Sequence, residues 1–206
     1  MKTALSVKNW NVDTKPEVLH NIHKKNVNIT IYNRTIDNLE EELNWLVKND
    51  IKLHSNGTIN TVLSHLPKTL ELSKCPNVLQ DINTLLQYFN EVTNSKEYRL
   101  LLATIDNDMC RKFHMDNNNL RMLCTYKGQG TLWLTEDNIN REALELRKTN
   151  EHIVIDENEI KQAKTGSILI LKGAKYAIEQ PNAIVHRSPT IKQNSEKRLL
   201  LRIDAN

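Results

Sequence analysis

Three residues in two distant stretches of the chain have the side chains and the spacing of metal ligands. His114 and Asp116 lie in FHMD, and His186 lies in VHRSP. Residues two apart in a β-strand point to the same face, about 7 Å from each other, so His114 and Asp116 could converge on one ion. If His186 arrives from another strand, two imidazoles and one carboxylate form the ligand set of mononuclear non-haem iron oxygenases.

The same residues also have a purely structural interpretation. His114 could be a hydrogen-bonded histidine of a β-barrel, and Asp116 could cap the turn that follows it. An HxD pair alone occurs by chance in many chains, but its place on a strand, followed by one late histidine, favours a metal site. We interpret the remaining histidines as solvated surface residues, because each is isolated or has no carboxylate partner: His20, His23, His54, His65 and His152.

The cysteines do not form a recognisable metal or disulfide motif. Cys75, Cys110 and Cys124 are odd in number and lack CxxC spacing. Cys110 has the same strand parity as His114, but four strand residues span about 13 Å, too far for a shared metal. We therefore expect Cys110 to lie beside the site or in the core, and Cys124 to be a core residue. The chain has no GxSxG, GxxxxGK[ST], GxGxxG or HExxH motif that would favour another chemistry.

The elements that must position these residues change character near residue 95. Up to that point apolar residues recur at helical spacing, which predicts helices over 35–48, 60–72 and 77–93. Beyond it the period is two, and turn residues separate eight predicted strands at 98–106, 110–116, 120–126, 130–134, 152–155, 167–172, 183–186 and 198–204. The pattern predicts an α+β protein with a mainly helical region, 1–95, packed on a β-domain of the jelly-roll type, 96–206.

Composition excludes several classes of protein. The chain is 39% hydrophobic and 26% charged, which is enough apolar material for a proper core. Its length of 206 residues is too short for two large domains. The net charge of +3 is interspersed and aromatics make up 5%, which argues against a nucleic-acid-binding surface. No run of 18 apolar residues predicts a membrane span, and the first residues lack the apolar core of a secretory signal, so we expect a cytoplasmic protein.

Three stretches carry a resemblance to a known family. They are CRKFHMDNNNLRMLCTYKGQGTLWL at 110–134, GSILILKG at 166–173, and VHRSP followed by RLLLRID. Over residues 95–206 the chain resembles an uncharacterised bacterial family of unknown function with the pattern FHxD, RLLCTYxGxGTxWL, VHRSP and RLLL. That pattern in turn is similar to the HxD, His and Arg layout of iron(II)/2-oxoglutarate oxygenases, whose fold is a double-stranded β-helix of the cupin-like, jelly-roll type.

The resemblance implies iron(II) held by His114, Asp116 and His186, and 2-oxoglutarate as cosubstrate. The far carboxylate of 2-oxoglutarate then needs a buried cation, and a guanidinium binds it through two parallel hydrogen bonds. In such enzymes this arginine usually follows the distal histidine. Arg198 and Arg202 both do so here, but they stand about 13 Å apart along one strand, so only one can serve. We choose Arg198, whose alternative is a solvated strand-edge role, and take Arg121 and Tyr126 as second choices.

Two other functions remain open at this point. The three ligands, with water or a thiol as a fourth, could bind zinc for storage or delivery. The resemblance supports that alternative as readily, because members of the family are found beside zinc-limitation genes. Otherwise the chain could be a β-domain that binds a small ligand or partner, with the histidines merely structural. The sequence predicts neither the primary substrate nor the oligomeric state.

Overall fold

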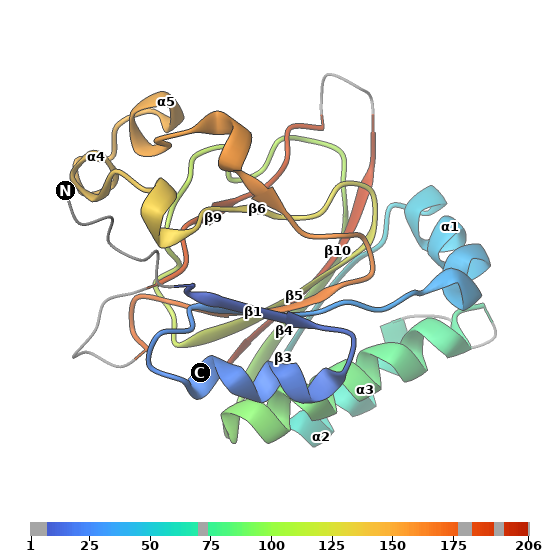
Figure 1. Cartoon of the computed structure of the whole chain (residues 1–206). Coiled ribbons are helices and arrows are strands. Elements are labelled where there is room, and N and C mark those ends of the chain that lie inside the picture. The colour runs from blue at the N-terminus through green and yellow to red at the C-terminus, as the bar shows by residue number, and fades with distance from the viewer. Residues whose placement is uncertain (1–7, 70–73, 177–182, 192–195, 206) are drawn as a thin grey trace.

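The computed structural model describes residues 8–69, 74–176, 183–191 and 196–205. Within these ranges the chain is a mixed α+β structure with two β-sheets and several helices (Figure 1). The larger sheet has the strand order β1-β2-β8-β5-β10-β4-β3 and the smaller one β7-β6-β9. The strands are β1 (Trp10–Asp13), β2 (Ile29–Tyr32), β3 (Lys52–Gly57), β4 (Tyr98–Ile105), β5 (Leu120–Lys127), β6 (Leu132–Trp133), β7 (Lys161–Gln162), β8 (Ile168–Lys172), β9 (His186–Arg187) and β10 (Arg198–Ala205).

Helices cover one face of the large sheet, and shorter ones lie beyond the small sheet (Figure 1). The α-helices are α1 (Glu40–Lys48), α2 (Ile59–Thr69), α3 (Pro76–Thr93), α4 (Arg141–Glu145) and α5 (Asn150–Ile153). The 3-10 helices are η1 (Pro16–His23), η2 (Asp37–Leu39), η3 (Glu136–Asn138) and η4 (Glu157–Glu159). The predicted helices at 35–48 and 77–93 are confirmed as η2 with α1 and as α3. The predicted helix at 60–72 is confirmed as α2 up to Thr69, and residues 70–72 lie outside the described residues. None of the described helices is both long and apolar enough to cross a membrane.

The central strands β5 and β10 are buried on both faces, and their residues alternate between two cores. Along β10, Leu199, Leu201 and Ile203 pack against the helices, whereas Leu200 faces the small sheet. Arg198 and Arg202 are each two residues from Leu200, so the period of two places both arginines on the face toward the small sheet. β10 pairs antiparallel with both β4 and β5, so side chains on the same face of these three strands lie side by side.

The first 95 residues contain strands as well as helices. β1, β2 and β3 all join the large sheet, β1 and β2 on one side and β3 at the other edge. The mainly helical description of residues 1–95 missed them because they are only four to six residues long. In β3 the polar sequence KLHSNG also buries only Leu53 and Ser55. Strands from both sides of residue 95 thus share one sheet.

Two predicted strands of the β-rich region are wrong. Residues 152–155 form the end of α5 and one isolated bridge at Val154, and β7 takes the edge of the small sheet instead. A period of two over four residues was too short to exclude a helical turn. Residues 110–116 are a loop in which only His114 makes a β-bridge, to His186. Cys110 has φ = 45°, a left-handed conformation that interrupts an extended strand.

Gly130 allows a close backbone contact within the small sheet, between the start of β6 and the end of β7. A Cβ at this position would lie 2.0 Å from the carbonyl oxygen of Ala163. Because real side chains do not tolerate such a contact, glycine is required where the chain enters β6. β6 then pairs with β9, which places Trp133 opposite His186.

Candidate metal centre

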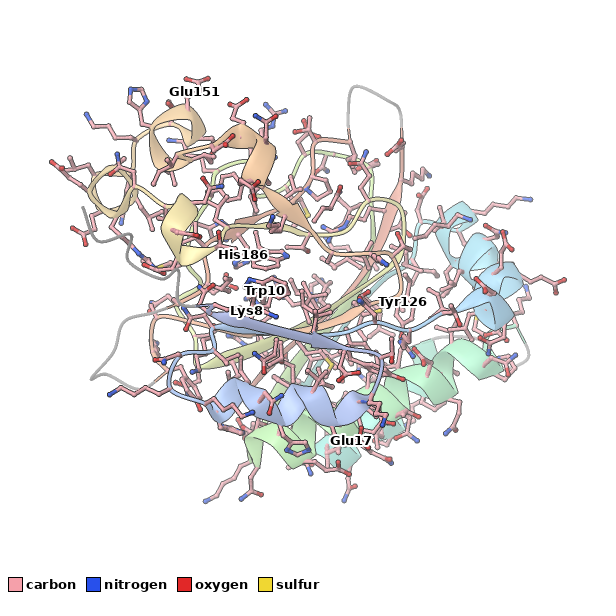
Figure 2. All side chains as sticks on the ribbon, in the orientation of Figure 1. Lys8, Trp10, Glu17, Tyr126, Glu151 and His186 are labelled. Carbon is pink, nitrogen blue, oxygen red and sulfur yellow. The ribbon has the colours of Figure 1, made fainter. Side chains whose placement is uncertain are left out.

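The two histidines face each other across the only bridge that the 110–116 loop makes in the described structure. The backbone N–H of each donates to the carbonyl oxygen of the other at 3.0 Å. Their ring centroids are 4.7 Å apart. His186 is buried and lies between the small and the large sheet (Figure 2), whereas His114 is half-buried. Two backbone hydrogen bonds therefore hold the loop that carries His114 against the strand that carries His186, 72 positions later in the sequence.

Asp116 completes the cluster. Its Oδ1 lies 3.6 Å from His114 Nε2, and its Oδ2 lies 3.3 Å from His186 Nε2. One ligand atom from each of the three side chains falls within 4.8 Å of the others. In the part of the chain that the structure describes, this is the one group of three His, Cys, Asp or Glu residues so close together. The geometry suits a single ion between them.

The other nitrogen of each imidazole is held by the backbone. His114 Nδ1 lies 2.9 Å from the carbonyl oxygen of Lys112, and His186 Nδ1 lies 3.4 Å from that of Ile184. A carbonyl oxygen can only accept, so each Nδ1 carries a proton and each Nε2 is directed toward Asp116, where it can bind a metal once it is deprotonated. This is the arrangement in which proteins prepare histidines for a metal. The residues therefore fit a divalent cation.

Burial and charge act differently on the three ligands. Burial lowers the pKa of His186 to about 4, so this imidazole is neutral at physiological pH. The hydrogen bond to Asp116 raises the pKa of His114 against the effect of burial. Burial would raise the pKa of Asp116, but the hydrogen bond from His114 and the charges of His186 and Arg121 lower it to about 2. The cluster thus offers an ionised carboxylate and a neutral buried imidazole.

Arg121 on β5 fixes the carboxylate. Its Nη1 lies 2.5 Å from Asp116 Oδ2, and its Nε donates to Asp204 Oδ1 at 2.5 Å. Asn118 Nδ2 donates to the same Asp204 oxygen at 3.0 Å. Arg121 was a second choice for the cosubstrate, but in the structure its charge is paired with two carboxylates. Its observed contacts orient Asp116.

The segment 141–153 packs against the loop 110–116, which carries His114 and Asp116. Asn150, at the start of α5, accepts from the backbone N–H of Phe113 and donates to the carbonyl of Arg111, both at 2.9 Å. Phe113 packs with Ile153 and Leu144 in a small core behind the histidines. No local sequence pattern points to Asn150, because a single asparagine at a polar helix start gives no signal of a contact with Phe113, 37 residues away.

Arg198 is buried without a carboxylate partner among the described residues. It is 2% exposed, and its Nη2 donates to Thr125 Oγ1 at 2.8 Å and to Thr131 Oγ1 at 2.9 Å. Its Nη1 lies 3.5 Å from Ser188 Oγ. Burial lowers the pKa of Arg198 to about 10, which is still high enough for the guanidinium to be charged at neutral pH. A buried charge that meets only hydroxyl groups is a candidate anion-binding group.

One pocket connects Arg198 with the histidines. Its lining includes residues of both sheets and of the 110–116 loop, namely Leu101, Ile105, Met109, Cys110, His114, Arg121, Leu123, Thr131, His186, Ser188, Arg198, Leu200 and Arg202. Arg202 therefore lines the same pocket as Arg198. Cys110 is exposed at this pocket but does not belong to the ligand cluster. Trp133 is buried between the two sheets, in the core next to this pocket.

Tyr126 lies on the opposite face of the large sheet. Its hydroxyl donates to Asp81 Oδ2 on α3 at 2.6 Å, and its ring packs in the core beneath the helices. Tyr126 is five residues from Arg121, an odd spacing that directs the two side chains of one strand to opposite faces. The four arginine and tyrosine candidates thus divide into three on the pocket side and one away from it.

The fold is similar to those of three solved oxygenases. The dioxygenase for auxin oxidation 1 of Arabidopsis thaliana, solved with 2-oxoglutarate, matches 96% of this chain and 92% of its own with a TM-score of 0.57 at 7% identity. A prolyl-4-hydroxylase of Pseudomonas putida matches 93% of this chain and 97% of its own, with a TM-score of 0.51 at 8% identity. The rice dioxygenase for auxin oxidation matches 86% of this chain and 73% of its own, with a TM-score of 0.50 at 9% identity. At such identities the likeness concerns the fold.

Sequence comparison identifies a family but no characterised relative. No curated protein matches the chain. The family model described as "Protein of unknown function (DUF1826)" matches residues 13–204. This match confirms the predicted membership of an uncharacterised family, and it extends well before residue 95, where the sequence resemblance began. The chain therefore belongs to the DUF1826 family of proteins of unknown function.

Proposed function

We propose that this protein is an iron(II)- and 2-oxoglutarate-dependent oxygenase of the hydroxylase type, built on a double-stranded β-helix. The order β8-β5-β10-β4 in the large sheet, opposite β7-β6-β9 and the bridge at His114, supports that fold. Two facing four-membered layers, in which strands alternate between sheets along the chain, are typical of jelly rolls. β1, β2 and β3 extend the larger layer beyond this unit.

The observation that carries the proposal is that two of the three clustered ligands, His114 and His186, line one pocket with Arg198, which has no carboxylate partner among the described residues. Histidines with a purely structural role would not require a buried guanidinium beside them. A protein that only stores a metal would not require one either. Burying an arginine without a carboxylate is unfavourable unless a ligand compensates it. A dicarboxylate that binds a metal at one end and Arg198 at the other meets both requirements.

Each residue of the site would have a defined task. His114, Asp116 and His186 would hold iron(II), and the backbone carbonyls of Lys112 and Ile184 keep both imidazoles in the required tautomer. Arg198 would bind the far carboxylate of 2-oxoglutarate, with the Thr125 and Thr131 hydroxyls holding the guanidinium in place. When bound, iron(II) would activate O2 as the oxidant, and 2-oxoglutarate would supply two electrons by its oxidative decarboxylation to succinate and CO2. The apolar side chains of the pocket exclude water.

The proposal is tested by reconstitution. The protein is loaded with iron(II) without oxygen, titrated with 2-oxoglutarate, and then exposed to oxygen. We expect a weak visible charge-transfer band on titration and slow succinate release afterwards. His114→Ala and His186→Ala should each lose bound metal, whereas His54→Ala, an exposed histidine on β3, should keep it. Unchanged metal content in both site variants would refute a metal function.

Zinc binding without oxidative chemistry makes a different prediction. Two imidazoles and a carboxylate also suit zinc, and a closed structural site would add a fourth protein ligand. Cys110, the nearest thiol in the sequence, does not belong to the described cluster. Tight retention of zinc together with no 2-oxoglutarate band would therefore replace the oxygenase by a metal-binding protein.

A further inference from the structure

The pocket beside the ligands contains an excess of positive charge. Three guanidinium groups line it, those of Arg121, Arg198 and Arg202. Only two carboxylates of the described residues pair with them, Asp116 and Asp204. The two positive charges of a divalent metal ion and the two negative charges of 2-oxoglutarate would cancel each other. One positive charge is then left over in a largely apolar pocket, where an unbalanced charge is unfavourable.

Arg202 carries that excess charge. Arg121 holds both carboxylates at 2.5 Å, and Arg198 is the group proposed to bind 2-oxoglutarate. The only contact of Arg202 with Asp204 is through Nε, which lies 3.4 Å from Oδ2. The other oxygen of that carboxylate already accepts hydrogen bonds from Arg121 and Asn118. No other described carboxylate forms an ion pair with Arg202. Its side chain lines the pocket and is 34% exposed, and its buried Nε makes no hydrogen bond in the structure.

The surroundings of Arg202 restrict the chemistry of that ligand. Arg202 pairs in register with Leu101 of β4 and Leu123 of β5, and Leu200 is the next residue on its face of β10. All three leucines line the pocket. A ligand bound there meets one cation and an apolar wall. A singly charged carboxylate balances the excess charge, whereas a doubly charged phosphate monoester would exceed it.

We propose that the primary substrate is a small organic monocarboxylate with an apolar body, whose carboxylate is bound by Arg202. This inference rests on the proposed function, because the charge count includes a divalent metal and 2-oxoglutarate. It assigns the two arginines of β10 to different ligands, Arg198 to the cosubstrate and Arg202 to the substrate. Leu101, Leu123 and Leu200 contact the apolar body.

The test uses matched acids and amides as probes. The full-length protein is loaded with manganese(II), titrated with 2-oxoglutarate by calorimetry under nitrogen, and then titrated with butanoate, hexanoate, butanamide and hexanamide at constant ionic strength. We expect hexanoate to bind at least tenfold more tightly than hexanamide, and more tightly than butanoate. Arg202→Gln should remove the preference for the acid, and Arg202→Lys should retain part of it. Equal binding of acid and amide would overturn the proposal.

Two further outcomes locate the acid site. Arg147→Gln is the matched control, since Arg147 is an exposed arginine that lines a neighbouring groove with Lys112 and Lys148 and does not line the pocket of Arg202; the two share His114. If Arg147→Gln removes the acid preference and Arg202→Gln does not, the inference is wrong. If Arg202→Gln weakens 2-oxoglutarate more than hexanoate, Arg202 belongs to the cosubstrate and the inference is also wrong. Failure of the initial 2-oxoglutarate titration would instead refute the proposed function.

Discussion

Arg34, whose side chain is 14% exposed, and Arg198, which is 2% exposed, lie on opposite faces of the same sheet, and their charges are compensated in different ways. Arg34 forms two parallel ion-pair contacts with Asp81 of α3, and the Tyr126 hydroxyl donates to that carboxylate. Its Nε also donates to the carbonyl of Gly166 at 3.0 Å. Arg198 is held only by the hydroxyl groups of Thr125, Thr131 and Ser188. One guanidinium is neutralised within the fold and the other is not.

The pKa values of the two arginines move in opposite directions. Burial acts to lower both, but the hydrogen bonds and charge of Asp81 raise the pKa of Arg34 well above its ordinary value. Burial without such a partner lowers the pKa of Arg198 to about 10. A buried charge with an internal partner contributes to structure, whereas one without a partner is available to a ligand. The helix-covered face therefore carries a neutralised arginine, whereas the face toward the small sheet carries one that has no carboxylate partner among the described residues and is proposed to bind a ligand.

The largest expected effect comes from removing the internal partner on the structural face. Asp81→Asn leaves Arg34 buried with an uncompensated charge, and breaking such a pair should cost about 3–5 kcal/mol of unfolding free energy. Urea unfolding measures the loss. The double variant Arg34→Met/Asp81→Leu is the control, because it removes both charges and should recover most of the stability. A loss below about 1 kcal/mol in Asp81→Asn, the range of a surface ion pair, would contradict the comparison.

Acid should destabilise the functional face through His186. Its folded pKa of about 4 lies below the unfolded value of 6.5, so between these pH values the unfolded chain binds a proton that the folded protein does not. The contribution of His186 to stability therefore falls as pH falls from 6.5 to 4, by roughly 3 kcal/mol in the metal-free protein, and the raised pKa of His114 opposes part of that loss. Asp116 adds a loss only at lower pH, as pH falls from its ordinary pKa of 3.8 to the folded value of about 2. Urea unfolding from pH 7 to 4.5 measures the slope, which His186→Asn should reduce and His54→Asn should not.

Arg198→Met separates binding from stability. Replacing an unpaired buried charge by an apolar side chain should leave the unfolding free energy unchanged or raise it. The loss of a charged bidentate contact should weaken 2-oxoglutarate binding by about 2–3 kcal/mol, or roughly a hundredfold. Denaturation and calorimetric titration of the manganese-loaded protein measure the two quantities. Destabilisation as large as that of Asp81→Asn would show that both arginines are structural.

The smallest effect concerns the cysteines of the two faces. Cys124, beneath the helices, is fully buried, and burial raises the pKa of its thiol to about 11. Cys110 is exposed at the mouth of the pocket. Iodoacetamide should therefore modify Cys110 in the native protein and leave Cys124 unmodified, with mass spectrometry as the readout. Modification of Cys124 at the same rate would mean that the helix-covered face opens easily.

Local spacing predicted much of the fold and of the candidate site. The helices α1, α2 and α3 follow from apolar residues at helical steps, and β4, β5, β8 and β10 from runs of apolar residues between turns. The prediction that His114 and Asp116 lie in a strand was wrong, yet both side chains still approach His186. Parity along β5 could also have placed Tyr126 on the other face from Arg121, because the period of a strand is two.

The sequence by itself determined which side chains could bind a metal and which face of β10 carries Arg198 and Arg202, since both depend on residue type and strand period. Only the tertiary structure decided what each of these groups meets. Arg121 could have served the cosubstrate until Asp116 and Asp204 were found beside it, and Asn150 had no visible role until it was seen to hold the Phe113 backbone. Such contacts join residues that are dozens of positions apart, and no local pattern records the pairing of charges between elements that meet only after folding.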